Sequence, residues 1–241
     1  MYKRQSNRLE LEILLQHYTY DSLKLEAAKF LIRNMPHCYS YQQGGEMDSV
    51  KRVRTYYSPF GQIDQTYARR WGHYTYRNLP KIYDAHIITA EYLIDNIDRA
   101  FDNWQKRPWN RSLSFEDFCE YLLPYRIGDE PLEEWRELYE KKYGYLLDSI
   151  YKGSDVVEAA NLVSRHLQEP VFIYCEDFEL PHIGPRYLFS HRYGSCVDAA
   201  DIVTYAFRAV GIPCMEDTDA RGGHVWNVVR DTTGRDVPIW Y

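Results

Sequence analysis

Apolar residues recur at helical spacing along most of the first two thirds of the chain. This pattern predicts helices over residues 21–34, 87–104, 114–123, 135–150 and 154–167. Proline follows three of these segments, at Pro36, Pro108 and Pro124, and cannot continue a helix. Ser114 and Ser154 precede two of them in the position of a capping residue. The first part of the chain is therefore expected to be mostly helical.

The pattern of residue types changes after Pro170, where short segments rich in β-branched and aromatic residues begin. Strands are predicted at 171–175, 187–189, 225–229 and 236–241, with a helix at 196–209 between the second and third. Gly211 lies where a helix C-cap glycine is expected, and the turn 231–234 joins the last two strands into a hairpin. Helices first and then strands, with one further helix among them, predict an α+β fold.

Composition limits the class of protein. The 241 residues are 45% hydrophobic and 27% charged, which is typical of a soluble globular chain with a proper core. No apolar run is long enough to cross a membrane. The net charge of −6 argues against nucleic-acid binding, because phosphate contacts need clustered cations, and the short basic run at 51–54 is typical of a solvated face. The 23 tyrosines and 6 tryptophans keep a glycan or cell-wall-facing role open.

The five cysteines, at positions 38, 119, 175, 196 and 214, include no Cys-x-x-Cys pair. An odd number without such spacing supports neither a disulfide framework nor a thiolate zinc site, and we expect no metal and no cofactor. The first ten residues are polar and do not form a signal peptide, so the sequence leaves the compartment open, as it does the oligomeric state.

Cys196 has the local setting of a reactive thiol. Ser195 is a favourable N-cap residue and Asp198 follows three positions later, as in a capping box, which places Cys196 in the first turn of the helix. The partial positive charge and unpaired N–H groups of a helix N-terminus stabilise a thiolate, and the same N–H groups can hold an oxyanion. Gly194 leaves room for a substrate carbonyl to approach.

His224 is the predicted partner of this thiol. It follows Gly222 and Gly223 at the start of a predicted strand, and a neutral imidazole there can accept the thiol proton. The other histidines have no comparable context.

Three motifs carry a resemblance to a known family. These are Gly-Ser-Cys-Val-Asp-Ala-Ala at 194–200, Ala-Val-Gly-Ile-Pro at 209–213 and Gly-His-Val-Trp-Asn at 223–227. Together they resemble the core of the transglutaminase-like superfamily, which has the papain-like cysteine fold. Residues 113–126 and the Trp-Arg pair at 135–136 are similar to the helical extension of such proteins from Bacteroidetes-type bacteria. The resemblance implies an aromatic-rich helical extension over 1–152 and a Cys/His core over 153–241, cut short at its C-terminal end.

By position, the resemblance implies that Cys196 is the nucleophile and His224 the general base, while the third triad member is unknown. If Arg230 faces Arg235 across the hairpin, Asp236 lies about 16 Å from His224 at roughly 3.3 Å per residue, and a shift of one residue still leaves about 13 Å or more. Trp240 or Tyr241 then occupies the place of the expected acid. Either the natural chain continues and supplies an Asp or Asn, or the site is degenerate.

The second oxyanion donor is also open, because no Gln precedes the cysteine as it does in papain-type proteases. Ser195, His191 and Tyr187 are candidates for the oxyanion site or the cleft, and Asp198 is a capping residue first and a cleft residue second. Glu216, Asp217 and Asp219 favour a solvated loop over a calcium site.

The function expected from this pattern is thiol-dependent acyl transfer. Cys196 is expected to attack a peptide, protein or cell-wall-type amide, and hydrolysis through a thioacyl intermediate is expected rather than cross-linking. The alternative is a catalytically degenerate module that binds protein or glycan. The resemblance makes an exported or cell-surface location plausible.

Overall fold

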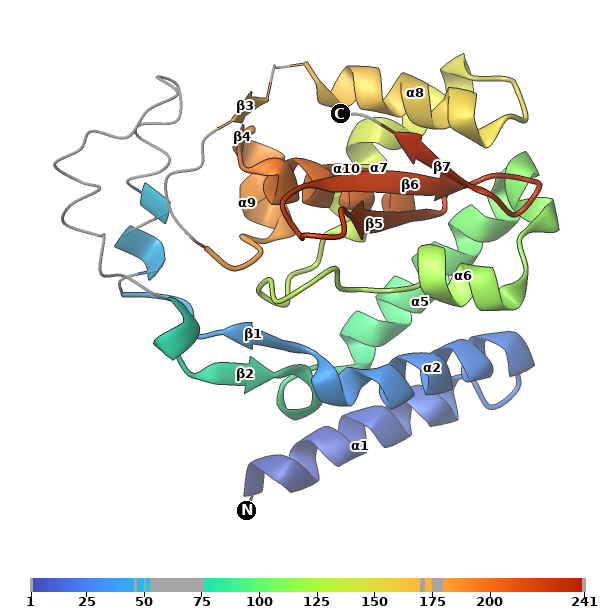
Figure 1. The fold of residues 1–241 in the computed structure, drawn as a ribbon. Helices are drawn as coiled ribbons and strands as arrows, with labels where there is room; N and C mark the ends of the chain where they lie inside the picture. The colour runs from blue at the N-terminus through green and yellow to red at the C-terminus, as the bar shows by residue number, and fades with distance from the viewer. Residues whose placement is uncertain are drawn as a thin grey trace, which may run out of the picture.

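The computed structural model describes residues 2–45, 47–49, 51–52, 76–169, 172–174 and 180–239. They form an α+β fold, as predicted, in which helices dominate the N-terminal part and a small sheet lies in the C-terminal part (Figure 1). The α-helices are α1 (Tyr2–His17), α2 (Ser22–Asn34), α5 (Ala90–Lys106), α6 (Phe115–Tyr121), α7 (Arg136–Tyr145), α8 (Val156–Leu167), α9 (Pro185–Ser190) and α10 (Cys196–Ala209). The strands are β1 (Tyr39–Tyr41), β2 (Lys81–Tyr83), β3 (Ile173–Tyr174), β4 (Tyr193–Gly194), β5 (Cys214–Thr218), β6 (Val225–Arg230) and β7 (Asp236–Ile239). Single helical turns connect them at Met35–His37, Tyr76–Asn78, Asp84–His86, Pro108–Ser112 and Leu146–Ile150.

Helices α1 and α2 lie at the bottom of the view in Figure 1, and α5 packs against both, so that the three helices enclose one hydrophobic cluster. The predicted helices at 21–34 and 87–104 are confirmed as α2 and α5, whose N-caps Asp21 and Thr89 accept backbone N–H groups. Helix α1 was not predicted. Its Leu9 and Ile13 side chains are exposed while Leu14 is buried, so its apolar residues do not mark one face.

A buried arginine joins these helices to the rest of the molecule. Arg136, at the start of α7, donates to the carbonyl oxygens of Leu122, Leu123 and Pro124 beyond the end of α6. It also donates to Asn96 Oδ1 of α5 and to the carbonyl of Arg208 on α10. A helix end leaves carbonyl groups without helical partners and carries partial negative charge, so a buried cation there satisfies both.

The C-terminal sheet is antiparallel in the order β5-β6-β7, and α10 and α8 pack against it. The predicted β6–β7 hairpin is confirmed, but its register differs by one residue, because Arg230 pairs with Asp236. The loop therefore spans residues 231–235, one residue more than the predicted turn. Within it, the Asp231 carboxylate accepts the N–H groups of Thr233 and Arg235. Strands β3 and β4 form a separate parallel pair.

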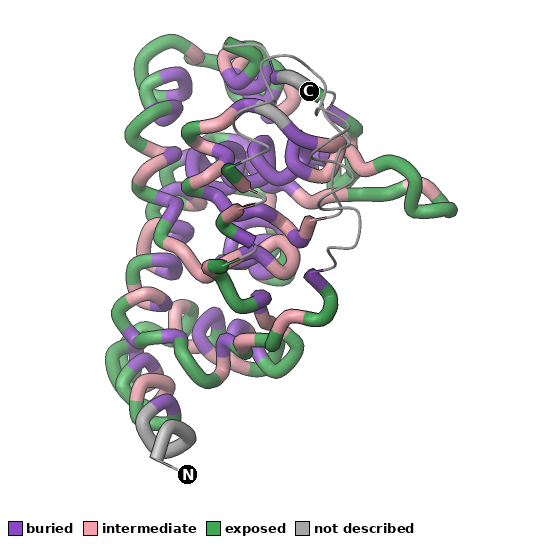
Figure 2. The backbone as a smooth tube through the Cα atoms, turned by 90° about the vertical axis from the view of Figure 1, so that its left-hand side faces the viewer, coloured by how far each residue is buried: buried purple, intermediate pink, exposed green. Residues whose placement is uncertain are grey.

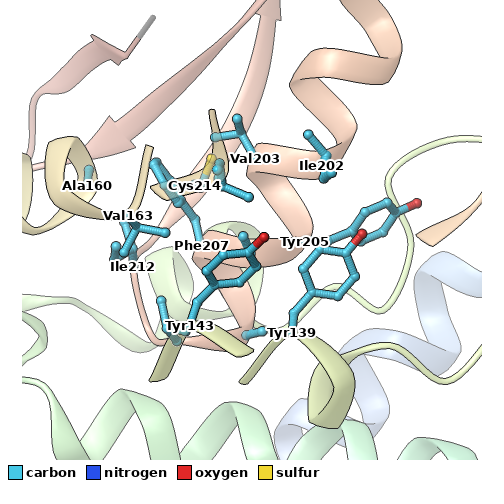
Figure 3. Packing of buried hydrophobic residues seen from close by; sticks show 14 of the residues in the cluster. Tyr139, Tyr143, Ala160, Val163, Ile202, Val203, Tyr205, Phe207, Ile212 and Cys214 are labelled. Carbon is cyan, nitrogen blue, oxygen red and sulfur yellow. The ribbon is translucent and has the colours of Figure 1, made fainter. Parts of the chain in front are cut away.

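Helix α10 is the centre of the larger core. Figure 3 shows Phe207 and Val203 of α10 among Tyr139 and Tyr143 of α7, Val163 of α8 and other buried side chains. Most of α10 from Asp198 onward is buried. Buried positions face inward along the other helices while exposed ones face outward (Figure 2).

Gly211 ends α10 as predicted, with φ +83°, and the N–H of Ile212 bonds the Phe207 carbonyl at 2.9 Å. The proposed division of the chain at residue 152 stays a prediction. However, α7 lies before that point and packs directly on α10, so the C-terminal core draws on both sides of it.

Two segments differ from the sequence prediction. Residues 187–189 form part of helix α9, not a strand, because Pro185 starts a helical turn that buries Leu188. Residues 214–218 form strand β5, although Glu216, Asp217 and Asp219 indicated a solvated loop. Helix α8 begins at Val156 and its cap is one residue later than predicted, since Asp155 and not Ser154 caps it by accepting from the N–H groups of Val157 and Glu158.

In the part of the chain that the structure describes, no helix combines the length and apolar character that crossing a bilayer requires.

We expect Arg136→Met to lower the free energy of unfolding by about 3 kcal/mol or more, because it leaves several buried carbonyl groups without a donor, at about 1–3 kcal/mol each. Urea denaturation followed by circular dichroism measures the change. Lys141→Met on the same helix is the control: its side chain is 72% exposed and its ion pair with Glu137 is worth about 0–1 kcal/mol. Equal effects of the two substitutions would contradict this role for Arg136.

Candidate functional site

Cys196 begins α10 as predicted, and its side chain is partly exposed. Ser195 is the N-cap residue, and the Asp198 carboxylate accepts from the Ser195 N–H at 2.7 Å and from the Ser195 hydroxyl at 3.1 Å. The prediction that Asp198 acts as a capping residue is confirmed. This cap fixes the first turn of the helix that carries the thiol.

Gly194 has a packing role at this point. A Cβ atom at position 194 would lie 2.3–2.5 Å from atoms of the Asp198 side chain. The space beside Gly194, which the sequence suggested for a substrate carbonyl, is therefore filled by the capping carboxylate.

His224 lies immediately before β6, at the end of the loop that follows β5, and it is exposed. The Asp219 Oδ1 atom accepts the N–H groups of Gly223 at 2.5 Å and of His224 at 3.3 Å. The His224 carbonyl in turn accepts from the Asp219 N–H at 3.1 Å and from the Thr218 hydroxyl at 3.0 Å. The Asp219 side chain thus organises the loop backbone that carries His224.

Cys196 and His224 line the same small cleft, of about 40 Å³. Two alanines of α10 form one side, and strands β6 and β7 form another. The described lining residues are Tyr174, Cys196, Ala199, Ala200, His224, Val225, Trp226, Asn227 and Ile239. None of these is an Asp, Glu, Lys or Arg, so this part of the cleft contains no fixed formal charge unless Cys196 or His224 ionises.

Aromatic side chains surround the thiol. Tyr174 of β3 is 53% exposed, and burial together with the nearby Cys196 raises the pKa of its phenol. The rings of His224 and Trp226 lie 6.0 Å apart at a tilt of 35°. Tyr174 was not singled out from the sequence, and its place in a predicted strand gave no sign that it would reach the cysteine.

Asn227 connects the two halves of the cleft. It is buried on β6, and its side-chain amide donates to the Ala200 carbonyl at 3.1 Å and to the Thr204 hydroxyl oxygen at 2.9 Å, both on α10. The strand that follows His224 is thereby tied to the helix that starts at Cys196.

The remaining predicted residues lie elsewhere or are not described. Tyr187 and His191 of the α9 region are not among the described residues that line the cleft; their rings stack at 4.4 Å, and the Tyr187 hydroxyl donates to the Lys51 carbonyl. Trp240 and Tyr241 lie outside the described residues. Asp236 forms an ion pair with Arg230 at 3.0 Å, six residues along β6 from His224, which is about 20 Å at 3.3 Å per residue.

A buried ionisable cluster lies behind the site. His182 Nδ1 is 2.8 Å from Asp201 Oδ1 on α10, and the Glu216 carboxyl accepts from the Thr204 hydroxyl at 3.1 Å. Burial opposes the charged imidazole, but the Asp201 carboxylate outweighs it and raises the pKa of His182 to about 10. Burial and the adjacent Asp201 raise the pKa of Glu216 well above its usual value. The carboxyl of Glu216 therefore binds its proton more tightly than a solvated acid does.

In the described segments, no group of three or more His, Cys, Asp or Glu side chains is arranged to hold a metal ion. A scan of protein-family models and searches of curated proteins and of solved structures found no match to this chain. The arrangement itself brings together a thiol at a helix N-terminus and an imidazole in a narrow cleft, whose described lining residues include no Asp, Glu, Lys or Arg.

Glu216→Gln is expected to change the pH dependence of stability. In the unfolded chain Glu216 releases its proton near its ordinary pKa of 4.5, whereas in the folded state it keeps the proton to higher pH. This group therefore contributes stability at low pH, and the contribution is lost as the pH rises toward the pKa of the folded state. The stability of the native protein relative to Glu216→Gln should therefore fall as the pH rises from 4.5 into the neutral range, by up to about 1.4 kcal/mol per pH unit. Urea denaturation across this range measures it, with the exposed Glu169→Gln as control; a constant difference would contradict the assignment.

Asp219→Ala is expected to release the loop before β6, because two backbone N–H groups lose their acceptor. Hydrogen exchange at the Gly223 and His224 amides should become at least several-fold faster. Asp217→Ala removes a neighbouring carboxylate that bonds Thr218 N–H instead, and should leave those two amides unchanged.

Proposed function

We propose that this chain is a thiol-dependent acyl-transfer enzyme that hydrolyses a peptide or amide bond through a Cys196 thioester. The observation that carries the proposal is that Cys196 and His224 line one cleft, although 27 residues separate them in the chain. The packing of α10 against β5 and β6, with the thiol at the helix start, supports a transglutaminase-like core.

In the first half of the reaction the Cys196 thiol proton passes to the His224 imidazole. The sulfur then bonds to the amide carbonyl carbon, and the carbonyl π electrons move to its oxygen. The C–N bond breaks, and the amine leaves with the proton from the imidazolium. In the second half a water molecule gives its proton to His224, its oxygen adds to the thioester carbon, and the C–S bond breaks to release a carboxylic acid.

The oxyanion is held at the start of α10. The Ser195 N–H already donates to Asp198, so it is not available to the substrate. The N–H groups of Cys196 and Val197 lie in the first turn, where no helical acceptor exists, and are the better donors. Tyr174 is a candidate for a second donor, since it carries a phenol hydroxyl and lines the same cleft as Cys196.

The cleft favours an uncharged acyl group. A volume of about 40 Å³ is roughly that of one water molecule in the liquid, so only a slender chain reaches the thiol. Aromatic rings at Tyr174 and Trp226 offer contacts to the apolar parts of a substrate.

The decisive measurement is the rate of iodoacetamide alkylation at Cys196 between pH 4 and 9, read by peptide mass spectrometry. We expect rapid labelling well below the free-thiol pKa of about 8.5, at least tenfold faster at pH 6 than at Cys38, because an imidazolium stabilises the thiolate. Burial raises the pKa of Cys38, which makes it an internal control in the same digest.

The variant His224→Ala tests the pair, and His224 is exposed, so its removal should not disturb folding. Labelling of Cys196 should then rise only near pH 8.5. The same pH profile of Cys196 labelling in both proteins would contradict the proposed enzymatic activity. It would favour the alternative, a module that binds protein or glycan through its exposed aromatic residues.

A further inference from the structure

A second cavity lies away from the Cys196 cleft. It has a volume of about 580 Å³, within the range of about 300–1,000 Å³ that small-molecule sites occupy. Helix α2, helix α6, the segment after α6 and strand β5 all contribute to its walls. Phe30 and Leu31, Ile127 and Met215 supply apolar surface from three of these elements.

Among the described residues that line this cavity, the buried charge is paired. Arg126 is the buried ion of the wall, and its guanidinium bonds both carboxylate oxygens of Asp84 and the Glu130 carbonyl. The Tyr125 hydroxyl also donates to Asp84, at 3.0 Å. Because the cation is already neutralised and its donors are engaged, an anionic ligand would gain no partner here and would lose its hydration.

The two thiols that line the cavity are neutral at physiological pH. Burial raises the pKa of Cys119 to about 12 and also raises the pKa of Cys38. The polar side chains of the lining lie toward solvent: Asn34, His37 and Glu120 are exposed. The cavity thus combines an apolar interior with hydrogen-bonding groups at its mouth.

We propose that this cavity binds an uncharged small molecule with an apolar aromatic or aliphatic body and a hydrogen-bonding group at one end. The body contacts Leu31, Ile127 and Met215, and the polar end faces Asn34 and His37. The site is independent of the thiol chemistry proposed above, since none of its lining residues belongs to the Cys196 cleft.

Two fluorescent probes test the proposal. N-phenyl-1-naphthylamine is neutral, and 1-anilinonaphthalene-8-sulfonate has the same ring system with an anionic group. Titration of the folded protein should show saturable one-to-one binding of the neutral probe, at least tenfold tighter than that of the sulfonate. The absence of saturable binding, or equal affinity for both probes, would overturn the proposal.

A cavity-filling variant locates the bound probe. Met215→Trp should weaken binding of the neutral probe at least tenfold, because the indole occupies part of the cavity. Cys119→Met provides the same test from helix α6 if the first variant folds poorly. Ile150→Trp, at a position that is 55% exposed and outside the cavity, should have no effect. Cys196→Ala should also bind normally. Unchanged binding in both cavity variants would place the probe elsewhere and refute the site.

Discussion

The enclosure of α10 is the constraint on which the rest of the structure depends. A helix buried on nearly all sides needs partners for its polar side chains, because an unpaired polar group in the interior costs about 1–3 kcal/mol. Asp201 binds His182, Thr204 bonds Glu216 and Asn227, and Arg208 donates to the carbonyls of Tyr121 and Cys214. These partners lie on β5, β6, α6 and the loop before α9, so satisfying the helix fixes these elements around it.

The candidate site follows from this arrangement. Cys196 begins the enclosed helix, where the chain emerges toward solvent, and the capping carboxylate of Asp198 holds that first turn. Asn227 ties β6 to the same helix, and His224 immediately precedes β6. The thiol and the imidazole therefore share a cleft because both are attached to groups that the buried network positions. Asp219 adds local order to the loop, where the backbone is otherwise exposed.

Arg136 links the N-terminal helices to the rest of the structure, because its N–H groups donate to acceptors on α5, on α10 and at the end of α6. A second buried arginine, Arg126, is neutralised by Asp84 beside the 580 Å³ cavity. In both places a guanidinium satisfies several acceptors at once, which suits its rigid set of donors. The two sites differ in volume and lining. The Cys196 cleft is narrow and contains a thiol and an imidazole, whereas the larger cavity has an apolar interior in which the buried Arg126 is already paired.

The sequence by itself determined those elements whose signals are local. Helices α2, α5, α6 and α10, the cap at Ser195 and Asp198, and the hairpin of β6 and β7 all follow from periodicity, capping residues, proline and glycine. Tertiary packing decided the rest. Strand β5 contains two acids and forms because β6 supplies its hydrogen bonds, α9 forms because Leu188 is buried against the core, and the hairpin register depends on how the Asp231 carboxylate folds the turn. Glu216 illustrates the reason most clearly. An acidic residue in this stretch of sequence indicates a solvated carboxylate, but burial of its side chain beside Asp201 raises its pKa well above the usual value, since the pKa of an acid is set by its surroundings and not by its neighbours in the chain.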